Sequence, residues 1–163
     1  MMGKSFASFT GSEVAVALLF PMETLFESYI AELLKKELDN REYTISIQDR
    51  KYYLFDEPDR KFLMKPDIVV TSRKNKSVYV MDTKWKILSE NKHNYGITQA
   101  DMYQMYAYQK KYSAVNVTLL YPMTENIPTK KGMEFTSEDG VNVRVKFIDL
   151  FKKDKLLSEI TFA

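Results

Sequence analysis

Two short apolar runs bounded by charged residues constrain this chain more than any other feature. Pro66-Asp67 precedes the first run, Ile68-Val69-Val70, and a polar turn follows at residues 72–77. The second run, Val78-Tyr79-Val80-Met81, ends in Asp82-Thr83-Lys84 instead of in a turn residue. Apolar runs of this length on either side of a turn predict a β-hairpin. Because side chains alternate along a strand, Asp82 and Lys84 point to the same side, and the hairpin brings Asp67 close to them.

The predicted cluster of two carboxylates and one ammonium group indicates a metal site. Carboxylate oxygens are hard ligands of the kind that Mg²⁺ prefers. A metal held in this way can polarise a phosphodiester, while a lysine orients the attacking water or stabilises the developing charge. The alternative is that Asp82 and Lys84 form an exposed pair at a strand end and that Asp67 is a turn residue after proline. Each short motif is common by chance, so the strand context carries the metal-site interpretation.

Length and composition limit the class of protein. The chain has 163 residues, a usual size for one domain, and 45% of them are hydrophobic, which is enough for a core. Its 24 basic residues nearly balance 22 acidic ones, which excludes a simple polycationic nucleic-acid binder but not a nuclease with a local basic groove. No apolar stretch approaches the roughly 18–20 residues of a membrane-spanning helix, and there is no signal-peptide pattern. With no cysteine there is no disulfide or thiolate site, so we expect a cytoplasmic protein that does not enter membranes.

Hydrophobic periodicity predicts an α/β fold with a mixed sheet flanked by helices. Helices are predicted over residues 21–38 and 99–112, and Thr98 and Asp101 form a capping box for the second. Strands are predicted over residues 43–47, 62–70, 78–85, 115–121 and 141–151, with a possible strand end at 52–55. The order is therefore helix, three strands, helix and one or two strands, with the second helix as a parallel crossover. Beyond these elements, the predictions are an irregular connection at 132–140, a short helix at 152–160, and either strand or helix at 14–20.

One face of the second predicted helix is polar. Gln104 and Tyr108 are four residues apart and share this face with Asp101. A polar stripe on a packed helix needs hydrogen-bond partners, which a functional site would supply. The alternative is an aromatic packing face whose tyrosine hydroxyl groups reach solvent.

These motifs together resemble the PD-(D/E)XK nuclease superfamily, and within it the group with a glutamine-x-x-x-tyrosine helix that RecB-type nucleases typify. More narrowly, they resemble the McrC family, the endonuclease subunits of McrBC 5-methylcytosine restriction systems. The resemblance covers roughly residues 14–151 and rests on residues 19–27, 64–69, 81–86 and 97–108. The chain departs from that family in two respects. The N-terminal region that usually engages the GTPase subunit is missing, so residues 1–163 are expected to be a single nuclease domain, and Trp85 stands where tyrosine is frequent.

The resemblance implies a PD-(D/E)XK core and a role for each residue of the motifs. Asp67 and Asp82 would bind Mg²⁺, for which Mn²⁺ can substitute, and the Thr83 carbonyl oxygen could add a ligand. Lys84 would position the water or stabilise negative charge. Three further catalytic-site residues are implied: Glu27 as the upstream acid, and Gln104 and Tyr108, which would fix the site or the DNA backbone. For Glu27, the alternative is a solvated side chain or one that pairs with a lysine such as Lys35.

The resemblance also implies partners. The substrate would be DNA, methylated in this system, and phosphate contacts are expected from Lys65, Lys86 and Lys92, although any of them can be an ordinary surface lysine. Recognition and GTP hydrolysis would belong to a McrB-like AAA+ subunit. Two other functions remain open: a RecB-type repair nuclease that cuts without a partner, and a non-catalytic nucleic-acid-binding or assembly module with the same fold.

Overall fold

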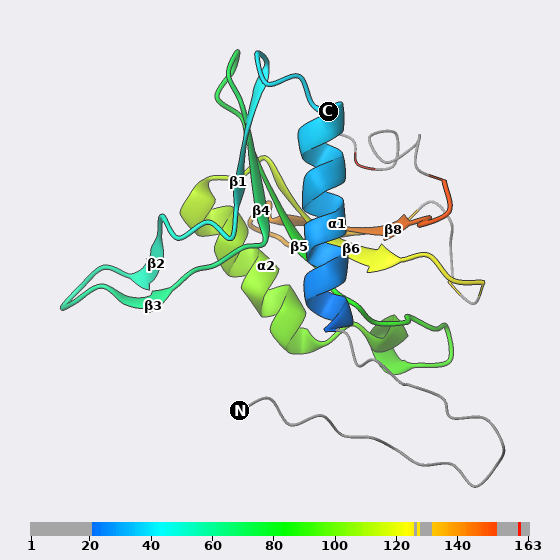
Figure 1. Ribbon diagram of the computed structural model, residues 1–163. Coiled ribbons are helices and arrows are strands. Elements are labelled where there is room, and N and C mark those ends of the chain that lie inside the picture. The colour runs from blue at the N-terminus through cyan, green and yellow to red at the C-terminus, as the bar shows by residue number, and fades with distance from the viewer. Residues whose placement is uncertain (1–20, 126, 128–131, 153–159, 161–163) are drawn as a thin grey trace, which may run out of the picture.

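The computed structural model describes residues 21–125, 127, 132–152 and 160, and shows an α/β fold (Figure 1). Its elements in chain order are α1 (Met22–Glu37), β1 (Tyr43–Ile47), β2 (Tyr53–Phe55), β3 (Lys61–Leu63), β4 (Ile68–Ser72), β5 (Val78–Thr83), the 3₁₀ helix η1 (His93–Gly96), α2 (Gln99–Tyr112), β6 (Asn116–Pro122), β7 (Met133–Thr136) and β8 (Asn142–Ile148). None of the helices in these ranges is long and apolar enough to cross a membrane.

Six strands form one mixed sheet in the order β1-β4-β5-β6-β8-β7. The β4–β5 hairpin is antiparallel, as the two apolar runs predicted. β6 lies parallel to β5 and β8 lies parallel to β6, whereas β1 and β7 pair antiparallel at the two edges. A parallel β5–β6 pair requires a crossover, and α2 supplies it, so the predicted crossover is confirmed.

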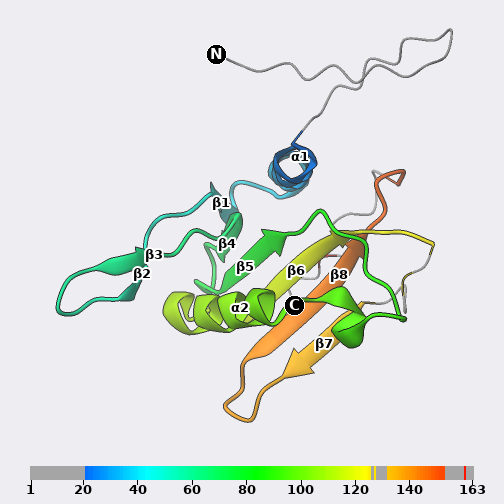
Figure 2. The same ribbon diagram turned by 90° about the horizontal axis from the view of Figure 1, so that it is seen from below.

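The two helices cover opposite faces of the sheet, which Figure 2 shows on either side of the β4–β5 hairpin. The apolar stripe of α1 packs against the side chains of Ile68, Val70 and Met81. The intervening residues Val69 and Val80 point the other way and pack with α2. This alternation determines which way the site residues point. Asp67 lies two residues before Val69 and Asp82 lies two residues after Val80, so both also lie on the α2 side.

The start of α2 is fixed by the predicted capping box. The Thr98 hydroxyl oxygen accepts a hydrogen bond from the Asp101 backbone amide, and the Asp101 carboxylate accepts one from the Thr98 amide. Two of the amides that a helix leaves unpaired at its N-terminus are thereby satisfied. The predicted bounds of α1, β1 and α2 agree with the structure to within one residue.

Three predictions about the strands were wrong. Residues 62–70 are not one strand, because β3 ends at Leu63 and β4 begins at Ile68, after Pro66. β3 pairs with β2 in a separate hairpin, so five strands instead of three precede α2 in the described part of the chain. The connection at 132–140 contains the edge strand β7. The predictions for residues 14–20 and for most of 152–160 lie outside the described residues.

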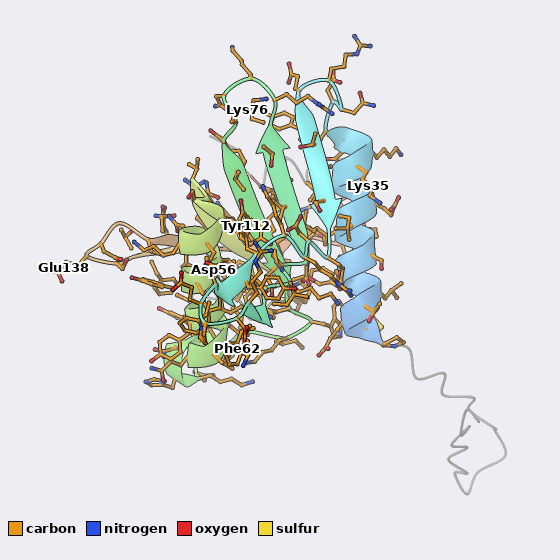
Figure 3. The ribbon with its side chains drawn as sticks, turned by 90° about the vertical axis from the view of Figure 1, so that its left-hand side faces the viewer. Lys35, Asp56, Phe62, Lys76, Tyr112 and Glu138 are labelled. Carbon is orange, nitrogen blue, oxygen red and sulfur yellow. The ribbon has the colours of Figure 1, made fainter. Side chains whose placement is uncertain are left out.

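The β2–β3 hairpin projects from the body of the protein (Figure 1), and Figure 3 shows Asp56 and Phe62 on it. An ion pair of 2.6 Å between the Asp56 carboxylate and the Lys111 ammonium group connects the hairpin to α2. Two-stranded hairpins are only marginally stable alone, so this contact helps to hold the hairpin against α2.

Candidate active site

Asp67 and Asp82 lie at the same end of two adjacent strands. Ile68 is the register partner of Met81, so the residue before Ile68 and the residue after Met81 are neighbours across the hairpin. Both follow the alternation of Val69 and Val80 and therefore face α2. The structure thus brings together the two carboxylates that the sequence predicted to converge.

The Asp67 carboxylate lies where the hydrogen-bonded ladder between β4 and β5 ends. Its Oδ2 atom accepts hydrogen bonds from the Thr83 amide and from the Thr83 hydroxyl, each at 2.7 Å. The next amide, that of Lys84, donates to the Leu120 carbonyl oxygen of β6, so the Thr83 amide faces β4. The Oδ2 atom of Asp67 therefore takes the place of a main-chain acceptor for the Thr83 amide. Asp67 lies in a bend directly after Pro66, and its carboxylate also connects this bend to β5.

Asp82 and Lys84 form a close ion pair at the end of β5. The distance between Asp82 Oδ2 and Lys84 Nζ is 2.5 Å, and the Asp82 side chain is only 4% exposed. Burial and the neighbouring charge of Asp67 raise the pKa of Asp82 to about 6, although Lys84 opposes this rise. Burial alone would lower the pKa of Lys84, but the negative charge of Asp82 outweighs it and the pKa of Lys84 is raised. The exposed surface pair is therefore excluded, and Lys84 is held as a cation.

A chain of hydrogen bonds links Lys84 to α2. Lys84 Nζ donates to Gln104 Oε1 at 3.3 Å, and Gln104 Nε2 donates to the Tyr108 hydroxyl at 2.8 Å. Tyr108 is only 3% exposed, and this burial raises its pKa, although hydrogen bonds with the Gln104 side chain and the Lys65 backbone oppose the rise. The alternative of hydroxyl groups that reach solvent is wrong for Tyr108, whereas the side chains of Tyr103 and Tyr106 are exposed.

Glu27 enters the site from the other helix. Its carboxylate accepts a hydrogen bond from the Gln48 side chain, whereas Lys35 pairs with Glu32, so Glu27 does not pair with Lys35. The Gln48 amide donates to the main-chain oxygen of Asp67 at 2.7 Å. Gln48 therefore connects Glu27 to β4, and its backbone has a φ of 50°. Sequence reasoning missed this residue because the contact depends on the β1–β4 register.

Most of these groups line one cleft of about 650 Å³, although Gln48 and Tyr108 are not among its lining residues. Acidic and basic side chains from both helices and from the ends of β4 and β5 form its walls. The predicted residues among them are Glu27, Asp67, Asp82, Thr83, Lys84 and Gln104, with Lys65 and Lys86 as the basic members. Lys92 is not among the lining residues, whereas Asp101, which was predicted only as a capping residue, is.

The donor set suits a hard divalent cation. Asp67 and Asp82 present carboxylate oxygens from adjacent strands, and their mutual repulsion contributes to the raised pKa of Asp82. Within the described ranges, no three histidine, cysteine, aspartate or glutamate side chains are close enough together to form a metal-binding group. A cation here would therefore use the two carboxylates and complete its shell with a main-chain oxygen such as that of Thr83 and with water, as Mg²⁺ commonly does.

Comparison with known proteins places the chain in a family. A model of the McrBC 5-methylcytosine restriction system component family matches residues 1–122. The chain belongs to this family. The match includes α1, the β4–β5 hairpin and α2, and thus every residue of the predicted site in this McrBC component. No curated protein matches the chain.

Proposed function

We propose that this McrBC component is the DNA-cleaving subunit of its restriction system, a Mg²⁺-dependent endonuclease with a PD-(D/E)XK core. The observation that carries the proposal is the convergence of Asp67, Asp82 and Lys84, with Gln104 behind them, in one cleft. Asp82 is buried beside a second carboxylate, that of Asp67, so its charged form is unfavourable and its pKa is raised. Groups with such shifts concentrate at functional sites. A non-catalytic assembly module has no use for them.

Each side chain then has a part in phosphodiester hydrolysis. A bound Mg²⁺ would supply Lewis-acid polarisation of the phosphate and a more acidic water. Asp67 and Asp82 would hold it, and Thr83 fixes the orientation of Asp67 through two hydrogen bonds. Lys84 is a cation, so it stabilises developing negative charge or orients the attacking water and does not abstract a proton. Gln104 limits the movement of Lys84.

The substrate is DNA that carries 5-methylcytosine, bound with the backbone along the cleft. Lys65 and Lys86 in the cleft wall are placed to contact phosphates, which position a duplex without reading its sequence. We assign recognition of the methylated base to a partner. We propose a McrB-like GTP-hydrolysing AAA+ subunit for that role.

Substitution of Lys84 tests the proposal. We expect Lys84→Ala to lower the rate of cleavage of methylated plasmid DNA by about 10²–10³ in the presence of Mg²⁺, GTP and the partner. Lys35→Ala is the matched control, because Lys35 lies on the outer side of α1, away from the cleft (Figure 3). Cleavage by Lys84→Ala at the wild-type rate would overturn the catalytic assignment. Equally fast cleavage without the partner would instead indicate a RecB-type nuclease.

Metal binding is measured separately. Calorimetric titration with Mn²⁺ should show weak binding by the wild-type protein and none by Asp82→Ala, because one carboxylate is then lost from the pair. Asp139→Ala, at an exposed ion pair outside the cleft, should bind as the wild type does. Equal binding by all three proteins would remove Asp82 from the metal site.

A further inference from the structure

We infer that Asp101 is a positioning residue for Lys84. Its carboxylate is a second negative charge, which keeps the Lys84 ammonium group in the cleft when Asp82 binds the metal. This inference rests on the proposed function and adds a residue to it. It is carried by the surroundings of one atom, Lys84 Nζ.

Three side-chain oxygens surround Lys84 Nζ. Asp82 Oδ2 is 2.5 Å away, Gln104 Oε1 is 3.3 Å away and Asp101 Oδ1 is 3.6 Å away. The first is an oxygen that the proposed cation would use, and a carboxylate oxygen shared with a metal is a poorer partner for an ammonium group. Of the remaining two, Gln104 offers only a neutral acceptor. Asp101 is therefore the neighbour that supplies negative charge to Lys84 once Asp82 binds the metal.

The Asp101 carboxylate is held in place for this task. Its Oδ2 atom accepts the hydrogen bond from the Thr98 amide at 3.3 Å, which leaves Oδ1 to face Lys84. Its side chain is 17% exposed, so solvent screens the Asp101–Lys84 interaction less than it screens a surface pair. One carboxylate thus caps α2 with one oxygen and approaches Lys84 with the other.

The capping function alone does not require a charge directed at Lys84. A neutral asparagine at this position could also accept the Thr98 amide, and glutamate is frequent at the same position of capping boxes. Substitutions can therefore separate the two roles. Asp101→Asn removes the charge and retains an acceptor, Asp101→Glu retains both, and Thr98→Ala weakens the cap but leaves the Asp101 carboxylate intact.

The experiment compares these three variants in the reconstituted system. Asp101→Asn should lower kcat about tenfold, the loss expected for one charge-assisted contact, while KM for DNA and the melting temperature stay near wild-type values. Asp101→Glu should recover most of kcat. Thr98→Ala should lower the melting temperature but leave kcat per folded molecule unchanged.

A second measurement does not depend on cleavage. Acylation of Lys84 by an amine-reactive reagent, followed by mass spectrometry, reports how well the ammonium group is held. Adding Mg²⁺ should leave Lys84 protected in the wild type and expose it in Asp101→Asn. If Asp101→Asn instead loses only thermal stability, with kcat and Lys84 protection unchanged, Asp101 is a cap alone and the inference is wrong. That result is distinct from failure of the proposed function, in which Lys84→Ala would also cleave normally.

Discussion

Asp82 should make the metal-free protein less stable as the pH rises, and Asp82→Asn should remove this effect. The pKa of Asp82 is raised from an ordinary value of 3.8 to about 6 by burial and by the charge of Asp67. A carboxyl group whose pKa is higher in the folded state releases its proton more easily in the unfolded state. Its contribution to stability is therefore lost between about pH 4 and pH 6, and stays lost above that range.

The magnitude follows from the size of the shift. A difference of about two pKa units corresponds to roughly 3 kcal/mol, of which about 2 kcal/mol falls between pH 4 and pH 7. Urea unfolding in the presence of a chelator, followed by circular dichroism and by the fluorescence of Trp85, the single tryptophan, gives the free energy of unfolding at each pH. The stability of Asp82→Asn minus that of the wild type should rise by about 2 kcal/mol from pH 4 to pH 7.

A control of opposite sign distinguishes this effect from general acid sensitivity. Hydrogen bonds from Lys110, Ser137 and Tyr106 hold the pKa of Asp139 below its usual value. Asp139 therefore contributes stability that is present above the unfolded pKa and is lost as the pH falls. The stability of Asp139→Asn minus that of the wild type should fall as the pH rises towards about 4, the unfolded pKa, and stay level above it. Parallel pH profiles for Asp82→Asn and the wild type would refute the argument that Asp82 is buried and repelled by Asp67.

Two further predictions concern polar groups near the site. Tyr112→Phe should lower the free energy of unfolding by about 1–2 kcal/mol, because the Tyr112 hydroxyl donates to Asp49 at 2.7 Å. Tyr121→Phe should leave the free energy of unfolding unchanged, because that buried hydroxyl has no hydrogen-bond partner among the described residues. Urea unfolding of both variants measures this, and equal losses would contradict it. Gln48→Gly should change stability by less than about 1 kcal/mol, because glycine suits the φ of 50°, yet slow cleavage by releasing Glu27. Full cleavage activity in this variant would show that Glu27 needs no support from Gln48.

Local patterns in the sequence predicted the elements that position the site. The two apolar runs around a polar turn predicted the hairpin, and the alternation of side chains along a strand predicted that Asp82 and Lys84 point to the same side, close to Asp67. The capping box predicted the first residue of α2, and the four-residue spacing of Gln104 and Tyr108 predicted that they share a face of that helix. These signals succeed because each depends on residues only a few positions apart.

The errors arose where neighbours in the sequence do not determine the contacts. The strand predicted at 62–70 ignored Pro66, which has no amide to donate to a ladder, so β3 and β4 separate around it. β7 was missed because it is a short, largely exposed edge strand without an alternating pattern. The support that Gln48 gives to Glu27 depends on how β1 pairs with β4, which no local pattern encodes.

The same proline stands where the β4–β5 ladder ends, beside the cleft residues Lys65 and Asp67. β4 and β5 pair as far as Ile68 and Met81, and beyond them β5 continues to pair only with β6. The Thr83 amide would then lack an acceptor, and Asp67 provides it with a side-chain oxygen instead of a main-chain carbonyl. At this end of the ladder Asp67 satisfies the Thr83 amide, and the register of the hairpin places its carboxylate beside Asp82. Pro66 has no amide to donate to β5, and the adjacent Asp67 supplies the acceptor that the Thr83 amide would otherwise lack.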